Sequence, residues 1–436
     1  MKRNIYKQLL KWKNQKHKKP LIVLGQRQIG KTYIINKFAN CEYKKNVYLN
    51  FMNYKEHNLL FENLNGFNDL LTKLMNYFSI NENEISNTLF FFDEIQECNN
   101  AIAALKMINE SSKKINVICS GSYLGYNIKT SYLNFPIGQV EIIHMYQMMF
   151  DEFVEAFDKK TILDCALEKV KNKEPIDQIY HEQLMKMFND YLIIGGFPEV
   201  VKTYIENKNT YNEALKILEY IHLGYQNDIN KYSQLFQSKT FLNLIYANIN
   251  KFLIKENKKF VFQELNKNYK YRELEKYLVW MNNSNLVIKV NNLKNLSFPL
   301  ISNGSDNYFK LYYNDHGFLS LSYNVQNILN SNLFNNIKGS LYENFVVTQL
   351  QSKFKNFFYY SFIKNGKRYE VDFVVENDKG ESCLIEVKSS QSFKIKSLKT
   401  IDSNNKYVLS PINYKIYNDY INIPIYLTCI LDEIIN

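Results

Sequence analysis

One stretch near the N-terminus constrains the fold of this chain more than any other. Pro20 to Leu24 is a short apolar run, Gly25 to Thr32 reads Gly-Gln-Arg-Gln-Ile-Gly-Lys-Thr, and Tyr33 to Phe38 has helical apolar spacing. The pattern G-x-x-x-x-G-K-[ST] therefore stands between a buried parallel strand and a helix, which is the context that gives it meaning. It predicts a parallel α/β domain with a loop that holds phosphate.

Each residue type in this loop has a physical task. The glycines let the backbone turn tightly, so that successive N–H groups and the helix N-terminus point at an anion. Lys31 is expected to reach the β- and γ-phosphates and Thr32 to hold Mg²⁺, so ATP and Mg²⁺ are the expected cofactors. The residues expected to bind the nucleotide are Gly25, Gln26, Arg27, Gln28, Ile29, Gly30, Lys31 and Thr32.

A second apolar run, Thr88 to Phe92, ends in two acids, Asp93 and Glu94. Ligands bind at the carboxyl ends of strands in open α/β sheets. Asp93 is therefore expected to support Mg²⁺ and Glu94 to polarise the attacking water, although two solvated turn acids are the alternative. Further strands are expected at 46–51, 115–119 and 140–144.

The strand at 115–119 leads into Ser120-Gly-Ser122. A small hydroxyl at that strand end is well placed to sense a γ-phosphate or its water, and a simple turn is the alternative. The expected catalytic residues are Lys31, Asp93, Glu94 and Ser122.

Length and charge limit the number of domains, the candidate partners and the expected location. The 436 residues predict two to four domains, and the net charge of +11 is concentrated in the first 19 residues, which hold eight Lys or Arg and no acid. Such a run can bind nucleic acid, so DNA is a candidate partner, whereas a solvated helix face above packed Ile5, Leu9 and Trp12 is the alternative. No apolar run approaches the ~20 residues of a membrane span, so no membrane and a cytoplasmic location are expected.

The order of motifs resembles a widespread prokaryotic family of AAA+ ATPases that carry a C-terminal restriction-endonuclease-like domain of unknown function. The resemblance rests on the loop, on Leu89 to Gln96 and on Ser120-Gly-Ser122. Later landmarks follow in order: Gly195-Gly-Phe-Pro-Glu199, Lys310 to Gly317, Gly339 to Asn344, Glu370 to Phe373 and Glu386-Val-Lys388. It implies an ATPase domain at 1–155, a helical region at 156–250, a winged-helix-like segment at 251–300 and a PD-(D/E)xK-like domain at 301–436.

Two departures from the family bear on turnover. Gln139 stands where the family usually has Arg, and Asn227 stands where it often has one before Asp-Ile. An arginine finger typically contributes ~10³–10⁵ in rate. The resemblance implies an ATPase that couples hydrolysis to a conformational change. The alternative is a regulatory DNA-binding protein that turns over ATP slowly or not at all and has an inactive nuclease-like domain. The client and the oligomeric state are open in both cases.

The C-terminal region offers a second group of carboxylates. Glu370 and Asp372 share one strand face, as do Glu386 and Lys388, and a hairpin would bring the two strands together. Asp372 and Glu386, with Lys388 and Glu343 nearby, could hold Mg²⁺ in the manner of many nucleases. Ordinary ion pairing across a hairpin is the alternative, and the nearly neutral region favours it.

The middle of the chain holds an apolar stripe from Tyr271 to Met281, a polar turn and the strand 286–290. Helix, turn and strand in that order suit a winged helix, in which Lys270, Arg272 and Lys276 could contact phosphates. A segment that only couples the domains on either side of it is the alternative, and the sequence favours neither interpretation over the other.

Overall fold

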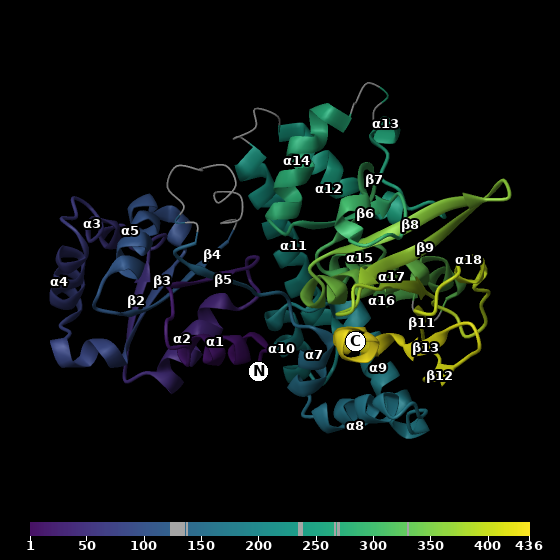
Figure 1. The fold of residues 1–436 in the computed structure, drawn as a ribbon, viewed down its shortest axis with the longest axis horizontal. Coiled ribbons are helices and arrows are strands. Elements are labelled where there is room, and N and C mark those ends of the chain that lie inside the picture. Colours follow the sequence, from purple (N-terminus) through teal and green to yellow (C-terminus); the bar gives the residue numbers. More distant parts are fainter. Residues whose placement is uncertain (123–135, 137, 234–238, 266, 268–270, 329–330) are drawn as a thin grey trace. The chain divides into compact units, whose positions relative to one another are not determined.

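The computed structural model describes residues 1–122, 136, 138–233, 239–265, 267, 271–328 and 331–436. It divides into two compact units (Figure 1). One unit spans Lys2–Tyr146 and includes Asn283–Asn285, and the other spans Gln147–Asn282 and Leu286–Asn436 together with Met1. Within the described residues, no helix combines the length and the apolar character that crossing a bilayer requires.

A five-stranded parallel sheet forms the centre of the N-terminal unit, in the order β2-β3-β4-β1-β5. Each strand lies within one or two residues of its predicted position, and β1, β3 and β4 are buried along their whole length, as their short apolar runs predict. The strands are β1 (Leu21–Leu24), β2 (Lys45–Asn50), β3 (Thr88–Asp93), β4 (Asn116–Gly121) and β5 (Glu141–His144).

Helices cover this sheet and fix its core. Leu70 and Leu74 of α4 and Leu105 of α5 pack with Phe90 and Phe92 of β3 in one buried cluster. These contacts explain why α4 and α5 form where apolar residues recur at helical spacing. The helices of the unit are α1 (Ile5–Lys13), α2 (Lys31–Glu42), α3 (Glu56–Leu59), α4 (Phe67–Phe78), η1 (Glu82–Asn87), η2 (Ile95–Glu97) and α5 (Asn99–Glu110).

The N-terminal helix α1 has the arrangement of a solvated helix over a packed face. Ile5, Leu9 and Trp12 are buried, while Lys7 and Lys11 are exposed. The Trp12 indole N–H donates to the Lys19 carbonyl at 2.8 Å, which ties the end of the basic segment to the helix. The basic run is therefore structured, with Lys7, Lys11 and Lys16 exposed and Lys13 half-buried in an ion pair with Glu42.

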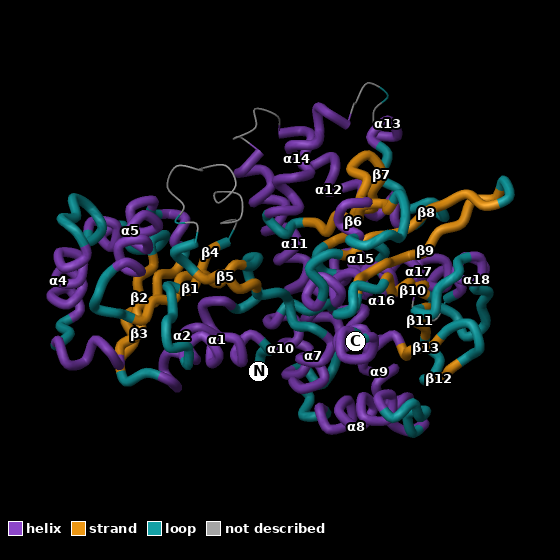
Figure 2. The backbone as a smooth tube through the Cα atoms, in the orientation of Figure 1, coloured by secondary structure: helices purple, strands orange, loops and turns teal. Residues whose placement is uncertain are grey.

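The second unit begins with helices, which Figure 2 shows in purple. Their apolar faces meet one another, for example where Phe197 of the α9–α10 turn packs against Tyr225 and Phe318. The helices are α7 (Phe150–Ala156), α8 (Lys160–Lys171), α9 (Gln178–Ile194), α10 (Pro198–Glu206), α11 (Tyr211–Ser233), α12 (Lys239–Leu253), α13 (Phe262–Leu265), α14 (Tyr271–Asn283), η4 (Leu300–Asn303), α15 (His316–Ser322), α16 (Val325–Ile328), α17 (Asn332–Lys353), α18 (Lys396–Thr400), η5 (Ile425–Ile430) and α19 (Asp432–Ile435).

An eight-stranded mixed sheet completes this unit, in the order β12-β13-β11-β10-β9-β8-β6-β7. Helix α17 contacts β7 and β10 and buries residues around its whole circumference from Ser340 to Leu350. The strands are β6 (Val287–Leu293), β7 (Gly304–Tyr313), β8 (Phe357–Lys364), β9 (Lys367–Glu376), β10 (Ser382–Val387), β11 (Lys406–Ser410), β12 (Lys415–Ile416) and β13 (Ile421–Pro424).

The middle segment joins this sheet directly. Strands β6 and β7 form an antiparallel hairpin after α14, which is the element order expected of a winged helix, but β6 also pairs in parallel with β8. The sheet therefore crosses the predicted boundary between residues 300 and 301. Of the side chains predicted to contact phosphate there, Lys270 and the Arg272 side chain lie outside the described residues.

Candidate functional site

The loop between β1 and α2 contains two residues with a left-handed backbone conformation, and glycine adopts this conformation more easily than other residues. Gly30 has φ 89°, a left-handed conformation that favours glycine, and Gln28 also has positive φ at 63°. Helix α2 begins immediately afterwards at Lys31, so its N-terminus opens onto the loop. This is the strand, loop and helix that the sequence predicts.

Lys31 points back into the loop. Its side chain is 6% exposed, and Nζ donates to the Gly25 carbonyl at 2.9 Å, to the Gln26 carbonyl and to Ser122 Oγ at 3.3 Å. Burial lowers the pKa of Lys31 to about 8, against the opposing charges of Glu94 and Asp93. The Lys31 ammonium thus contacts only uncharged oxygens in these hydrogen bonds. A phosphate group bound in the loop would supply the negative charge that pairs with it.

Asp93 organises the carboxyl end of the sheet. The Thr32 hydroxyl donates to Oδ2 at 3.0 Å and the Tyr48 hydroxyl at 2.8 Å, while Asn50 Nδ2 donates at 3.3 Å and the Ser120 hydroxyl donates to Oδ1. Sequence reasoning missed Tyr48 and Asn50. Their alternation at the end of β2, the strand next to β3, is the signal that could have found them.

Glu94 follows Asp93 in a left-handed conformation, with φ 51° and ψ 46°. Such a backbone is uncommon for a residue other than glycine and costs about 1–3 kcal/mol. The Gln96 side chain donates to its carboxylate. Glu94 thus stands at the carboxyl end of β3, directly after Asp93.

Gln139 and Asn227, at the two positions where the resembling family has arginine, differ in their surroundings. The Asn109 side chain donates to Gln139 Oε1 at 2.5 Å, and Asn227 lies on an exposed part of α11. The structure thus brings Lys31, Thr32, Asp93 and Ser122 together in one unit. It offers no arginine at either of those two positions.

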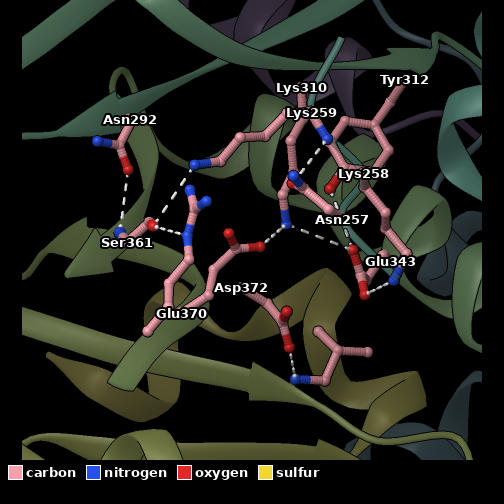
Figure 3. A network of polar contacts seen from close by, with 12 residues as sticks. Asn257, Lys258, Lys259, Asn292, Lys310, Tyr312, Glu343, Ser361, Glu370 and Asp372 are labelled. Carbon is pink, nitrogen blue, oxygen red and sulfur yellow. Dashed lines mark hydrogen bonds and ion pairs between the residues drawn. The ribbon is translucent and has the colours of Figure 1, made fainter. Parts of the chain in front are cut away.

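A second polar network lies in the C-terminal sheet (Figure 3). Lys258 pairs with Glu343 of α17, whose Oε2 also accepts from the Tyr312 hydroxyl at 3.2 Å. Lys310 lies between two carboxylates, 2.7 Å from Glu370 and 3.9 Å from Glu343. Sequence reasoning singled out neither Lys258 nor Lys310 as a partner of these acids.

Burial would lower the pKa of Lys310, but the nearby Tyr312, Glu343 and Glu370 side chains outweigh it and hold the pKa well above its usual value. For Asp372, burial and not the attraction of a nearby charge determines the direction of the pKa shift. Burial and the charge of Glu343 raise its pKa to about 7, against the attraction of Lys310. Its Oδ2 accepts the Val387 N–H at 2.8 Å, which holds β9 against β10.

The hairpin brings its predicted residues to one place. Lys388 Nζ lies 2.5 Å from Glu386 Oε1, and Asp372, Glu386 and Lys388 line one cavity of about 970 Å³. Burial raises the pKa of Glu386, while Lys388 opposes that shift. Among the residues that the structure describes, no three His, Cys, Asp or Glu side chains are grouped so that they could hold a metal ion.

Three family models match separate parts of the chain. One described as an AAA domain matches residues 17–154, and two described as domains of unknown function, DUF8612 and DUF4143, match residues 185–328 and 338–430. The first match contains all five parallel strands and the loop. Residues 17–154 therefore form an AAA-type P-loop ATPase domain. The match over 338–430 carries no activity with it, so the endonuclease-like character of 301–436 stays a prediction.

One relative is similar along most of its length. The uncharacterized protein MJ1544 of Methanocaldococcus jannaschii is 26% identical over 423 residues, which is 91% of this chain and 82% of that protein. The Walker-type ATPase PABY2304 of Pyrococcus abyssi has 13% identity and a TM-score of 0.43, covering 72% of this chain and 93% of that one. The ORC2 protein of Aeropyrum pernix, in its ADPNP–ADP complexes, has 12% identity and a TM-score of 0.35, covering 75% and 92%.

Proposed function

We propose that this protein binds Mg-ATP at the β1–α2 loop and hydrolyses it. The hydrogen bond from Thr32 to Asp93, 3.0 Å long, is the observation that carries the proposal. It joins the end of the loop to the acid after β3, two motifs 61 residues apart in the sequence. An AAA-type domain supplies this pair for the metal side of a nucleotide.

The donor set fits Mg²⁺. Neighbouring ligands of an octahedral site with bonds of ~2.1 Å lie about 3 Å apart, which matches the Thr32–Asp93 separation of 3.0 Å. Both donors are oxygens, the ligands that Mg²⁺ prefers. Thr32 and Asp93 would hold the ion, which when bound neutralises phosphate charge.

The other residues take roles that their positions support. Lys31 exchanges its carbonyl partners for phosphate oxygens, and Ser122, 3.3 Å from Lys31 Nζ, lies where the terminal phosphate would be sensed. Glu94 accepts a proton from the attacking water as a general base. Tyr48, Asn50 and Ser120 hold the Asp93 carboxylate in one orientation.

A protein that binds ATP but hydrolyses it slowly is the second candidate function. Gln139 and Asn227 replace two arginines of the resembling family, and neither amide can supply the positive charge that a finger brings to the transition state. A protein of this kind would hold ATP as a regulatory state, with DNA as a candidate partner. Turnover measured with and without DNA separates the two candidates.

Two substitutions test the ATP site. Lys31→Ala is expected to reduce ATP affinity by at least about 100-fold, because it removes the buried charge that meets the phosphates. Glu94→Gln is expected to keep ATP affinity within about threefold of wild type and to lower turnover at least ~100-fold. Calorimetric titration and phosphate release measure the two effects. Tight ATP binding by Lys31→Ala would show that the loop is assigned wrongly.

For the C-terminal carboxylates, we infer an ion network in preference to a resident metal. Lys258, Lys310 and Lys388 each pair with one of these acids, so the negative charge that would attract a cation is already balanced. Metal-dependent cleavage at Asp372 and Glu386 remains the competing proposal.

A further inference from the structure

Arg3 lies just before α1 and contacts two distant parts of the ATPase unit. Its side chain is buried, with 8% of the residue exposed. Nη1 donates to the Ile29 carbonyl at 2.7 Å, and Nη2 donates to the Tyr146 carbonyl at 2.6 Å. The two arms of one guanidinium thus join the phosphate-binding loop to the segment that follows β5.

The contact with Ile29 fixes the direction of a peptide group that matters for phosphate. In a trans peptide the carbonyl of one residue and the N–H of the next point in opposite directions. Because Arg3 holds the Ile29 carbonyl on one side, the Gly30 N–H points to the other side of the same peptide. An N–H at this step of a glycine-rich loop is one of those that form an anion cradle.

The Ile29 side chain and the neighbouring Gly25 are closely packed. The Ile29 side chain is fully buried. A Cβ added at Gly25 would come within 2.5 Å of both Ile29 Cδ1 and the Met145 carbonyl oxygen, so these groups enclose Gly25 closely. The Met145 N–H also donates to the Leu24 carbonyl at 2.7 Å. Arg3 therefore holds the carbonyl of a residue whose side chain is already closely packed.

Composition supports a specific need for arginine here. The chain uses 50 Lys and only four Arg, so a cation without a geometric requirement is nearly always Lys. A planar guanidinium can direct two N–H groups at two carbonyls in fixed directions, which an ammonium on a flexible stem does less well.

We propose that Arg3 is a positioning residue for nucleotide binding: it orients the Ile29–Gly30 peptide toward the phosphates and links that peptide to Tyr146, the last residue of the ATPase unit before the chain continues at Gln147. The proposal rests on the ATP site proposed above. On this proposal the N-terminal segment contributes to nucleotide binding through the geometry of Arg3, and not only through its positive charge.

Calorimetric titration of ADP into the full chain tests the proposal. Arg3→Ala is expected to weaken ADP affinity about tenfold, the loss that one charge-assisted hydrogen bond implies. Arg3→Lys is expected to fall between wild type and Arg3→Ala. Added guanidinium at millimolar concentration is expected to restore part of the affinity of Arg3→Ala and to leave wild type unchanged, a response that a general loss of packing would not give.

Two control variants separate positioning from packing and from charge. Leu9→Ala removes a buried side chain of α1 that has no hydrogen-bond donor, and Lys7→Ala removes one exposed positive charge from the same helix. Both are expected to keep ADP affinity within about twofold of wild type, even where Leu9→Ala lowers Tm as much as Arg3→Ala. Equal loss of ADP affinity in Leu9→Ala and Arg3→Ala, or wild-type affinity in Arg3→Lys or Arg3→Ala, would overturn the role of Arg3. Wild-type protein that binds no ADP would instead contradict the proposed ATP site itself.

Discussion

Lys31 makes nucleotide binding depend on pH. Burial lowers its pKa to about 8, so without phosphate the side chain loses its charge as the pH rises through that value. Only the charged form pairs with phosphate, so ATP affinity should be full below pH 7 and decline above pH 8. Between pH 7 and pH 9 we expect about a tenfold rise in the Kd for ATP.

The measurement is a series of ATP titrations across that range, at a constant ionic strength. Lys31→Arg is the informative comparison, because guanidinium keeps its charge throughout the range. Its profile should be flat whatever its affinity at pH 7. A wild-type profile as flat as that of Lys31→Arg would mean that Lys31 keeps its proton in the free loop.

At the scale of elements, the proton of Asp372 should stabilise the β9–β10 hairpin more at pH 5 than at pH 8. Asp372 has a raised pKa of about 7 in the folded protein, against about 4 in the unfolded chain. The folded state therefore holds this proton more tightly, and the stability that the proton contributes is lost as the pH rises from about 4 through 7. Asp372→Asn, which keeps an acceptor for the Val387 N–H, should raise Tm at pH 8 by roughly 2–4 °C.

Thermal unfolding at pH 5 and pH 8 checks this expectation, with Asp378→Asn as a control on an exposed acid of the same hairpin. Only Asp372→Asn should raise Tm more at pH 8 than at pH 5. Titration of Mn²⁺ into the full chain tests the competing proposal, in which Asp372 and Glu386 hold a metal ion. Stoichiometric binding that disappears in Asp372→Asn would mark a metal site in place of an ion network.

The two sheets differ in how far sequence could predict them. Three of the five parallel strands, β1, β3 and β4, are buried on both faces, so each appears as an apolar run, and two of them end in functional residues such as Asp93 and Ser120. In the mixed sheet the strand pairing is set over long separations: β6 pairs with β8, and no local pattern near 287–293 indicates that partner. Lys258 and Lys310 were missed for the same reason, because their carboxylate partner Glu343 comes from a helix far along the chain.

At the scale of the whole molecule, the net charge of +11 depends on one segment. Residues 1–19 hold eight basic side chains and no acid. The structure packs Ile5, Leu9 and Trp12 of α1 inward, so deletion of the segment would remove buried apolar surface together with the charge. Charge is better tested by substitution at exposed lysines, which leaves the packed face intact.

The triple substitution of Lys7, Lys11 and Lys16 by Gln should leave Tm and ATP affinity near wild type, since all three side chains are exposed. If this segment supplies phosphate contacts, the slope of log K against log salt for DNA binding should fall by about 2–3, because each lost contact removes ~0.9 from the slope on duplex DNA. The matched control replaces Lys202, Lys216 and Lys251, exposed lysines on helices of the other unit, and should leave the slope unchanged. An equal fall in both triple variants would mean that DNA responds to net charge alone. An unchanged slope in the first would assign α1 to packing and leave Arg3 as the residue through which the segment acts on nucleotide.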